Sequence, residues 1–139
     1  MKVSINAKPF HEDGHDYLRI MSQTILQNVK PGYPRREVMA LWDTGATNTY
    51  VPMELARRLE LPLGDVCNVS FSTADTPAQF CRFNLRFPDG IISVTDGVAV
   101  PGMKEQLIIG MDVMRHGRTT IEPDGNGGVE FTFTLSDEL

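Results

Sequence analysis

The chain has 139 residues, of which 41% are hydrophobic and 22% charged, and its formal net charge is -5. This length and composition predict one globular domain over residues 1–139 and exclude disordered or fibrous classes. Lysine and arginine are scattered, which excludes the basic footprint of a nucleic-acid partner. The sequence shows neither a signal-like apolar start nor a run of about 18 apolar residues. We therefore expect a cytoplasmic protein without a membrane partner.

Short extended runs separated by turn residues dominate the chain, which indicates an all-β domain. The predicted strands are, in chain order, residues 3–5, 17–26, 38–42, 68–73, 79–87, 91–100, 106–109, 119–122 and 129–135. Pro52 opens a short amphipathic helix over residues 53–61, and Pro62 ends it. A second brief helix is predicted over residues 111–116. The cluster Ala74-Asp75-Thr76-Pro77 predicts the turn of a hairpin.

The residues with chemical potential follow the apolar strand at 38–42. Asp43 can act as an acid or a base, and the hydroxyl of Thr44 can hold a loop in place. Gly45 allows a tight turn and a close approach by another chain or a substrate. Ala46, a small residue, completes the segment. An Asp-Thr-Gly tripeptide alone occurs by chance in roughly a few per cent of chains of this length, so its context decides its meaning.

That context is a second element near the end of the chain. An apolar run ends at Ile109, and Gly110 leads from it into the short helix. Together with the Asp43 segment, this element resembles the retropepsin-like (retroviral-type, single-domain) aspartic proteases, and it is closest in look to their bacterial and cellular members. The resemblance covers residues 38–117. It implies an acid-protease fold, which is a closed β-barrel with a flap hairpin and one or two short helices.

The resemblance also implies roles for individual residues. Asp43 would be the catalytic aspartate, Thr44 the hydroxyl that interlocks two subunits, and Gly45 and Ala46 the backbone that lines the cleft. The supporting loop would contain Ile109 and Gly110. The flap, which binds substrate, would carry the residues Ser72, Thr73, Ala74, Asp75 and Thr76. The substrate would be a peptide or a protein.

Two positions depart from the retroviral pattern. Retroviral enzymes generally carry an Asp after the Ala of the loop and an Arg after the later Gly, and these two side chains pair to brace the dimer. Thr47 and Met111 occupy the matching places in this chain. We therefore expect another contact to hold the dimer.

Counting carboxylates predicts how the site is assembled. Two carboxylates about 3 Å apart cannot both be ionised, so they share one proton. The chain has one Asp-Thr-Gly segment, and Asp96-Gly97 lacks the intervening hydroxyl residue. A homodimer would bring Asp43 to face its twofold mate. One carboxyl group would then activate water while the other donates to the scissile carbonyl, and the reaction requires no cofactor or metal.

Three alternatives to this mechanism remain open. Asp43 could be an ordinary turn aspartate, or the domain could be a catalytically inactive dimerisation or peptide-binding module. His11, Glu12 and His15 match the H-E-x-x-H motif of zinc-dependent hydrolases. That motif requires a helix, whereas Pro9 and the internal Asp13-Gly14 favour a polar hairpin loop.

Three further residues have predicted local roles. Cys67 and Cys81 are equidistant from Ala74, so a regular hairpin could place them opposite each other, although reduced thiols are expected in the cytoplasm. Asp112 follows Gly110 and Met111 and is expected to cap a turn or helix rather than to act as a second catalytic acid.

Overall fold

The computed structural model describes residues 1–71 and 74–136. The helices are α1 (Met53–Arg58) and α2 (Met111–Met114). The strands are β1 (Lys2–Ala7), β2 (Phe10–Glu12), β3 (His15–Tyr17), β4 (Met21–Gln27), β5 (Arg35–Trp42), β6 (Tyr50–Pro52), β7 (Leu63–Phe71), β8 (Ala74–Phe87), β9 (Gly90–Val100), β10 (Leu107–Ile109), β11 (Gly117–Pro123) and β12 (Val129–Leu135). Neither helix of the described residues has the length and apolar character needed to cross a bilayer.

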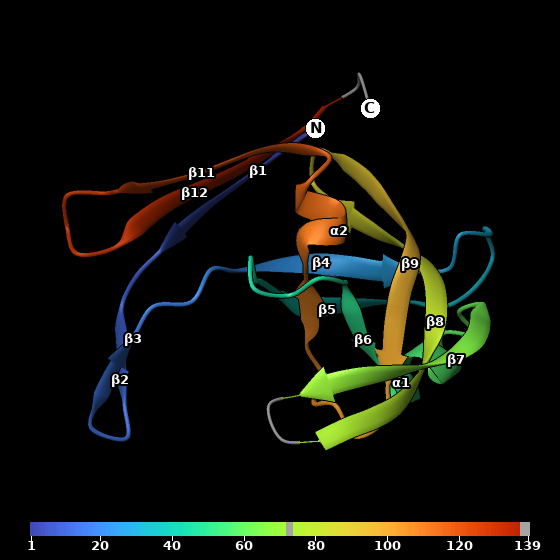
Figure 1. Cartoon of the computed structure of the whole chain (residues 1–139). Coiled ribbons are helices and arrows are strands. Elements are labelled where there is room, and N and C mark those ends of the chain that lie inside the picture. The colour runs from blue at the N-terminus through green and yellow to red at the C-terminus, as the bar shows by residue number, and fades with distance from the viewer. Residues whose placement is uncertain (72–73, 137–139) are drawn as a thin grey trace.

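Six strands form a closed barrel, which confirms the predicted fold class (Figure 1). They follow the order β4-β5-β10-β6-β9-β8, and a pairing between β4 and β8 closes the ring. The β5–β10 and β6–β9 pairs are parallel, whereas β4–β5 and β8–β9 are antiparallel. Strand β7 pairs only with β8 in this sheet, so these two strands extend from the barrel as a hairpin. Closure leaves the barrel strands without free edges.

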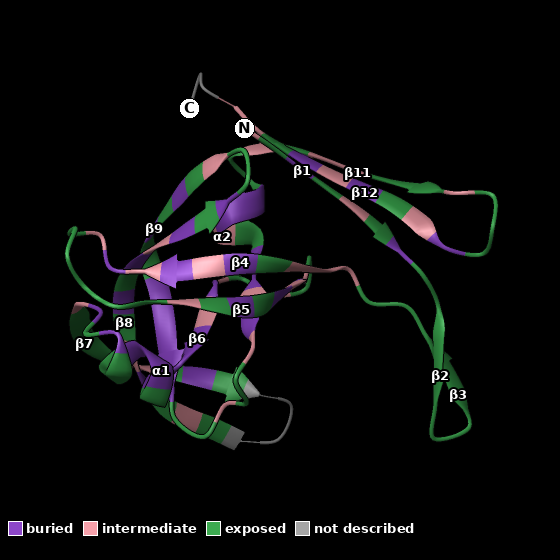
Figure 2. Cartoon of the chain, turned by 180° about the vertical axis from the view of Figure 1, so that it is seen from behind, coloured by how far each residue is buried: buried purple, intermediate pink, exposed green. Residues whose placement is uncertain are grey.

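The core lies inside this barrel because successive strand residues alternate between inward and outward faces. Figure 2 shows the buried residues concentrated on the barrel strands and the two helices. Trp42, at the end of β5, packs its ring against Phe87, Phe131 and Phe133 with centroid distances of 5.8, 5.2 and 5.4 Å. Its indole N–H donates to Ser22 Oγ at 2.9 Å. The buried tryptophan therefore fixes the end of the strand that precedes Asp43.

A second sheet with the order β1-β12-β11 lies beside the barrel. Phe131 and Phe133 of β12 are buried and connect this sheet to the barrel core. Both strand pairs are antiparallel, with Ile5 opposite Phe131 and Phe131 opposite Ile121. Figure 1 shows that the sheet extends well beyond the barrel. Ile121, at its outer part, is 50% exposed.

The predicted strand at 17–26 is two strands with a break between them. Strand β3 ends at Tyr17 and pairs back onto β2, and β4 begins at Met21. The β2–β3 turn contains Asp13 and Gly14, both with positive φ (50° and 79°), which suits a tight two-residue hairpin. The sequence pattern missed the break because the residues on both sides of it favour extended structure.

Helix α1 is shorter than predicted because its last turn unwinds at Glu60. This residue has a positive φ of 53°, and the amide of Leu61 donates to the carbonyl of Ala56 at 2.9 Å. Leu55, Ala56 and Leu59 are nevertheless buried, as their helical spacing predicts. Helix α2 likewise ends at Met114 rather than at residue 116.

The predicted turn at Ala74-Asp75-Thr76-Pro77 is wrong, because these residues begin β8. Asp75 pairs with Ser70 and Thr76 with Val69, and the Ser70 hydroxyl donates to Asp75 Oδ1 at 2.7 Å. Pro77 is tolerated because β8 pairs with β9 only from Gln79 onward, so this stretch is paired with β7 alone. Phe71 pairs with Ala74 at the end of this ladder.

Candidate active site

The Asp43 segment begins where β5 leaves the barrel. The amide of Trp42 donates to the carbonyl of Ile20 at 2.8 Å, and the amide of Asp43 donates to the carbonyl of Ile109 at 2.9 Å. The backbone at Asp43 is therefore held on both sides, by the residue preceding β4 and by β10. The Asp43 side chain itself is only partly buried. A fixed backbone with a partly exposed carboxylate is suited to reaction with an external ligand.

The loop after Asp43 is organised around its own aspartate. The amide of Gly45 donates to Asp43 Oδ1 at 2.8 Å, and the amide of Ala46 donates to the Asp43 carbonyl at 3.1 Å. The described part of the chain offers no hydrogen bond to Asp43 Oδ2. Asp43 thus caps its own turn with Oδ1, and Oδ2 is left for another partner.

Gly45 has no positive φ, so the tight turn does not depend on the backbone freedom of glycine. A Cβ at Gly45 would meet only Asp43 Oδ1, at 3.2 Å. Thr44 and Gly45 are both exposed, and Ala46 is partly buried. The outer side of the loop is therefore open to an approaching molecule.

The backbone around Gly110 lies against this loop and hydrogen-bonds to it. The amide of Met111 donates to the carbonyl of Ala46 at 2.8 Å, and the amide of Asp112 donates to the carbonyl of Thr47 at 3.2 Å. A Cβ at Gly110 would overlap the carbonyl oxygen of Asn48 and come within 2.7 Å of that of Ala46. Only glycine allows the two backbone segments this close approach.

Thr49 and Asp112 form a hydrogen-bonded tie that the sequence did not reveal. The Thr49 amide donates to Asp112 Oδ2 at 2.9 Å, and its hydroxyl donates to Asp112 Oδ1 at 2.7 Å. The same hydroxyl accepts from the Gly110 amide at 3.2 Å. Thr49 is fully buried. Asp112 lies in the first turn of α2, as expected, and its carboxylate also braces the loop through Thr49.

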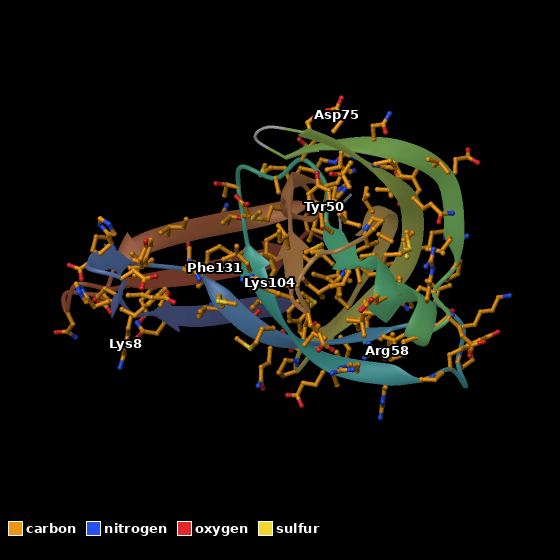
Figure 3. The ribbon with its side chains drawn as sticks, turned by 90° about the horizontal axis from the view of Figure 1, so that it is seen from below. Lys8, Tyr50, Arg58, Asp75, Lys104 and Phe131 are labelled. Carbon is orange, nitrogen blue, oxygen red and sulfur yellow. The ribbon has the colours of Figure 1, made fainter. Side chains whose placement is uncertain are left out.

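The β7–β8 hairpin covers a cavity next to the Asp43 loop. The cavity has a volume of about 310 Å³ and is lined by Thr47, Asn48, Tyr50, Cys67, Asn68, Val69, Ser70, Phe80 and Val98. In Figure 3, Tyr50 lies between the hairpin and the barrel, whereas Asp75 lies at the end of the hairpin and points away. Of the predicted flap residues, Ser72 and Thr73 lie outside the described residues. Ala74, Asp75 and Thr76 form the first part of β8.

Tyr50 gives this cavity a neutral phenol. Burial raises the pKa of Tyr50 above its ordinary value of 10.0, and the negative charge of Asp112 adds to the increase. Its ring packs against the small cluster that contains Val69 and Val98. The Tyr50 hydroxyl group therefore stays protonated at acidic and neutral pH, and the pocket wall carries no charge at this position.

Thr47 and Met111, which replace the charged pair of retroviral enzymes, are both exposed. Met111 has 39% of its surface accessible. The Thr47 and Met111 side chains leave this end of the barrel without an ion pair between these positions. A dimer built here must use other contacts.

The H-E-x-x-H segment forms the β2–β3 hairpin instead of a helix. His11 is opposite Asp16 and bonds it through Nδ1 at 2.8 Å, while Glu12 is opposite His15. No group of three His, Cys, Asp or Glu side chains within the described ranges could hold a metal ion. The geometry fits the polar hairpin and does not provide the helical face that zinc hydrolases use.

Cys67 and Cys81 do not face each other, because the register of β7 and β8 places Phe71 opposite Ala74. Cys67 is opposite Ala78, and Cys81 is opposite Leu63. Both thiols are free. Cys67 borders the cavity, whereas Cys81 is buried in the barrel core, where burial raises its pKa to about 12.

The sequence profile of a family described as "gag-polyprotein putative aspartyl protease" matches residues 34–116, more than half of the chain. The matched segment contains the Asp43 loop, the β7–β8 hairpin and Gly110. The chain belongs to this family. A retropepsin-like aspartic protease from Rickettsia conorii has a similar crystal structure, with a TM-score of 0.62 and 13% sequence identity. The alignment covers 97% of this chain and 94% of that one.

At this low identity, the Rickettsia structure supports the retropepsin-like fold alone. No curated protein matched the chain. The family and the fold are thus those that the Asp43 and Gly110 segments indicated in the sequence.

Proposed function

We propose that this retropepsin-like chain is an aspartic endopeptidase that works as a homodimer. The observation that carries the proposal is the half-satisfied carboxylate of Asp43. Its backbone is fixed by β10, one oxygen is held by the Gly45 amide, and the other has no hydrogen bond among the described residues. Because the sequence contains one such segment, a second copy would have to supply the other carboxyl group.

The proposed reaction uses two Asp43 carboxyl groups that share one proton. The ionised group removes a proton from a bound water, and the protonated group donates to the scissile carbonyl oxygen. The water attacks the carbonyl carbon, and proton transfer to the leaving nitrogen then breaks the peptide bond without a covalent intermediate. Thr44 is exposed beside Asp43, and in this proposal it would contact its twofold mate.

The substrate would lie in the cavity between the Asp43 loop and the β7–β8 hairpin, which acts as a flap in this proposal. An extended peptide can pair with strand-like backbone, while side-chain pockets provide selectivity. Val69, Phe80 and Val98 line this cavity together with polar Asn48 and Ser70. We therefore expect the cavity to bind an apolar side chain of the substrate, while Asn48 and Ser70 hydrogen-bond to the substrate backbone.

The test is the Asp43→Asn variant, assayed with a peptide library between acidic and neutral pH. We expect cleavage to fall to background while the circular dichroism spectrum and the dimer remain unchanged. Asn keeps the acceptor for the Gly45 amide, so the fold should tolerate it. Cleavage retained by Asp43→Asn would overturn the proposal, and intact peptides bound but never cut by the wild type would favour a binding module.

We also place the protein in the cytoplasm. Two free thiols, one of them bordering the proposed substrate cavity, suit a reducing compartment. Cell fractionation with an antibody against the native chain tests this location, and recovery of the protein in a secreted or periplasmic fraction would contradict it.

A further inference from the structure

The β2–β3 hairpin carries a compact aromatic and cationic face. Phe10 and Tyr17 are directly opposite each other, with their rings stacked at a centroid distance of 5.6 Å. The Arg19 guanidinium lies 5.4 Å from the Phe10 ring and 5.5 Å from the Tyr17 ring. Leu18, which follows Tyr17 in the sequence, is 39% exposed. Aromatic residues and arginine are the types most enriched at the energetic centres of protein interfaces.

This hairpin buries neither of its faces within the chain. All residues of β2 and β3 are exposed, including Phe10 and Tyr17 with 37% of their surface accessible. A two-stranded hairpin by itself is marginally stable in water, since it cannot bury apolar area on a third element. Figures 1 and 2 show the hairpin standing away from the barrel. The aromatic face of the hairpin is therefore available to pack against another molecule.

The position of the hairpin indicates which molecule that is. Its base is Ile20, which packs on the core and accepts a hydrogen bond from Trp42, the residue before Asp43. Figure 1 shows the hairpin and the loop that follows β5 on the same side of the barrel. Extended chain rises about 3.3 Å per residue, so Tyr17 is within about 10 Å of Ile20 and the hairpin tip within about 20 Å. A molecule that contacts Asp43 from outside is thus within reach of the hairpin.

We infer that the β2–β3 hairpin clasps a second copy of this chain through its Phe10, Tyr17 and Arg19 face. This inference rests on the proposed function, which requires a twofold mate with its own Asp43 against this one. A mate in that position occupies the space beside Ile20, where the hairpin leaves the barrel. Because the contact is isologous, each copy would offer its hairpin to the other, and every aromatic contact would occur twice.

The experiment is sedimentation equilibrium on the full chain over a wide dilution series. The test variant is Phe10→Ser combined with Tyr17→Ser, and the matched control is Tyr33→Ser. Tyr33 is a similarly exposed aromatic residue, 42% accessible, in the turn at the far end of β4 and β5. We expect the double variant to raise the dimer dissociation constant on the order of 100-fold or more, and the control to leave it unchanged.

Two further measurements separate the outcomes. Thermal unfolding should be the same for all three proteins under monomeric conditions, since the hairpin rings lie outside the core. At protein concentrations above the new dissociation constant, the double variant should recover the wild-type rate of peptide cleavage. An unchanged dissociation constant would overturn the inference, and lost cleavage by an intact dimer would assign the hairpin to the substrate. A hairpin-dependent dimer without peptidase activity would support the inference and contradict the proposed function.

Discussion

Ile20, at the base of the β2–β3 hairpin, accepts a hydrogen bond from Trp42, the residue before the Asp43 loop, but the hairpin and the loop are built in opposite ways. The loop is held by hydrogen bonds from β10, Gly110 and Asp112, which come from a segment more than sixty residues later in the chain. The hairpin has hydrogen bonds and ring contacts mainly within itself, and its strand residues are all exposed. The Asp43 carboxylate is thus held by hydrogen bonds to a distant segment, whereas the neighbouring hairpin does not pack against the rest of the described chain.

This contrast separates two requirements of the proposed enzyme. Catalysis requires a carboxylate fixed to within a fraction of an ångström, which close packing and buried hydrogen bonds provide. Recognition of another molecule requires surface that remains accessible until that molecule arrives. Substitutions behind the Asp43 loop should therefore change the stability of the fold, whereas substitutions in the hairpin should change association and leave stability unaltered.

The largest effect is expected for Gly110→Ala. The new methyl group would overlap the carbonyl oxygens of Asn48 and Ala46, which belong to backbone that cannot move without displacing the loop. We expect the free energy of unfolding to fall by about 3 kcal/mol or more in urea titrations. Gly64→Ala is the control, because its Cβ would lie 3.5 Å from Phe80 Cβ, an ordinary contact. Equal effects of the two variants would show that the loop is not tightly mounted.

A smaller effect is expected for Thr49→Val, which keeps the shape of a buried side chain and removes its hydroxyl. Asp112 Oδ1 loses a donor, and the Gly110 amide loses an acceptor. Leaving such buried groups unpaired costs about 1–3 kcal/mol of unfolding free energy. Hydrogen exchange at Gly110 should accelerate. Thr47→Val, an exposed position on the same loop, should change neither quantity, and a matching loss there would remove the special role of the Thr49 tie.

The smallest effect is expected for the pH dependence of stability, through Cys81 of β8. Cys81 is buried with its pKa raised from 9.0 to about 12, so the native thiol keeps its proton where the unfolded thiol ionises. The unfolded state then binds fewer protons, and stability is fully present below pH 9 and decreases as pH rises toward 12. The free energy of unfolding should fall by about 1 kcal/mol between pH 9 and 10 in urea titrations, and the slope should approach about 1.4 kcal/mol per pH unit above pH 10, where the unfolded thiol is ionised and the native thiol is not.

Cys81→Ala is the control for this slope, since it removes the titrating group while leaving every other ionisable residue. Its stability should be lower at neutral pH but should fall less steeply with rising pH than that of the wild type. Parallel decreases in the two proteins would contradict the assignment. A thiol reagent should modify Cys67, which borders the cavity, well before Cys81.

The sequence alone indicated the all-β fold and the family, and it did so through the segments around Asp43 and Gly110. These features can be predicted because an apolar strand, a glycine and a short helix are each encoded by consecutive residues. The amphipathic helix could be predicted for the same reason, and its apolar residues Leu55, Ala56 and Leu59 are buried.

Only the tertiary structure decided the features that depend on pairing between distant segments. The turn between β7 and β8 is set by the register that places Val69 and Ala78 in a buried cluster with Val98 and Val100, and this register outweighs the local turn preference of residues 74–77. The same register separates Cys67 from Cys81. The Thr49–Asp112 tie joins residues 63 positions apart. Such contacts arise from the closure of the barrel, which no short stretch of sequence encodes.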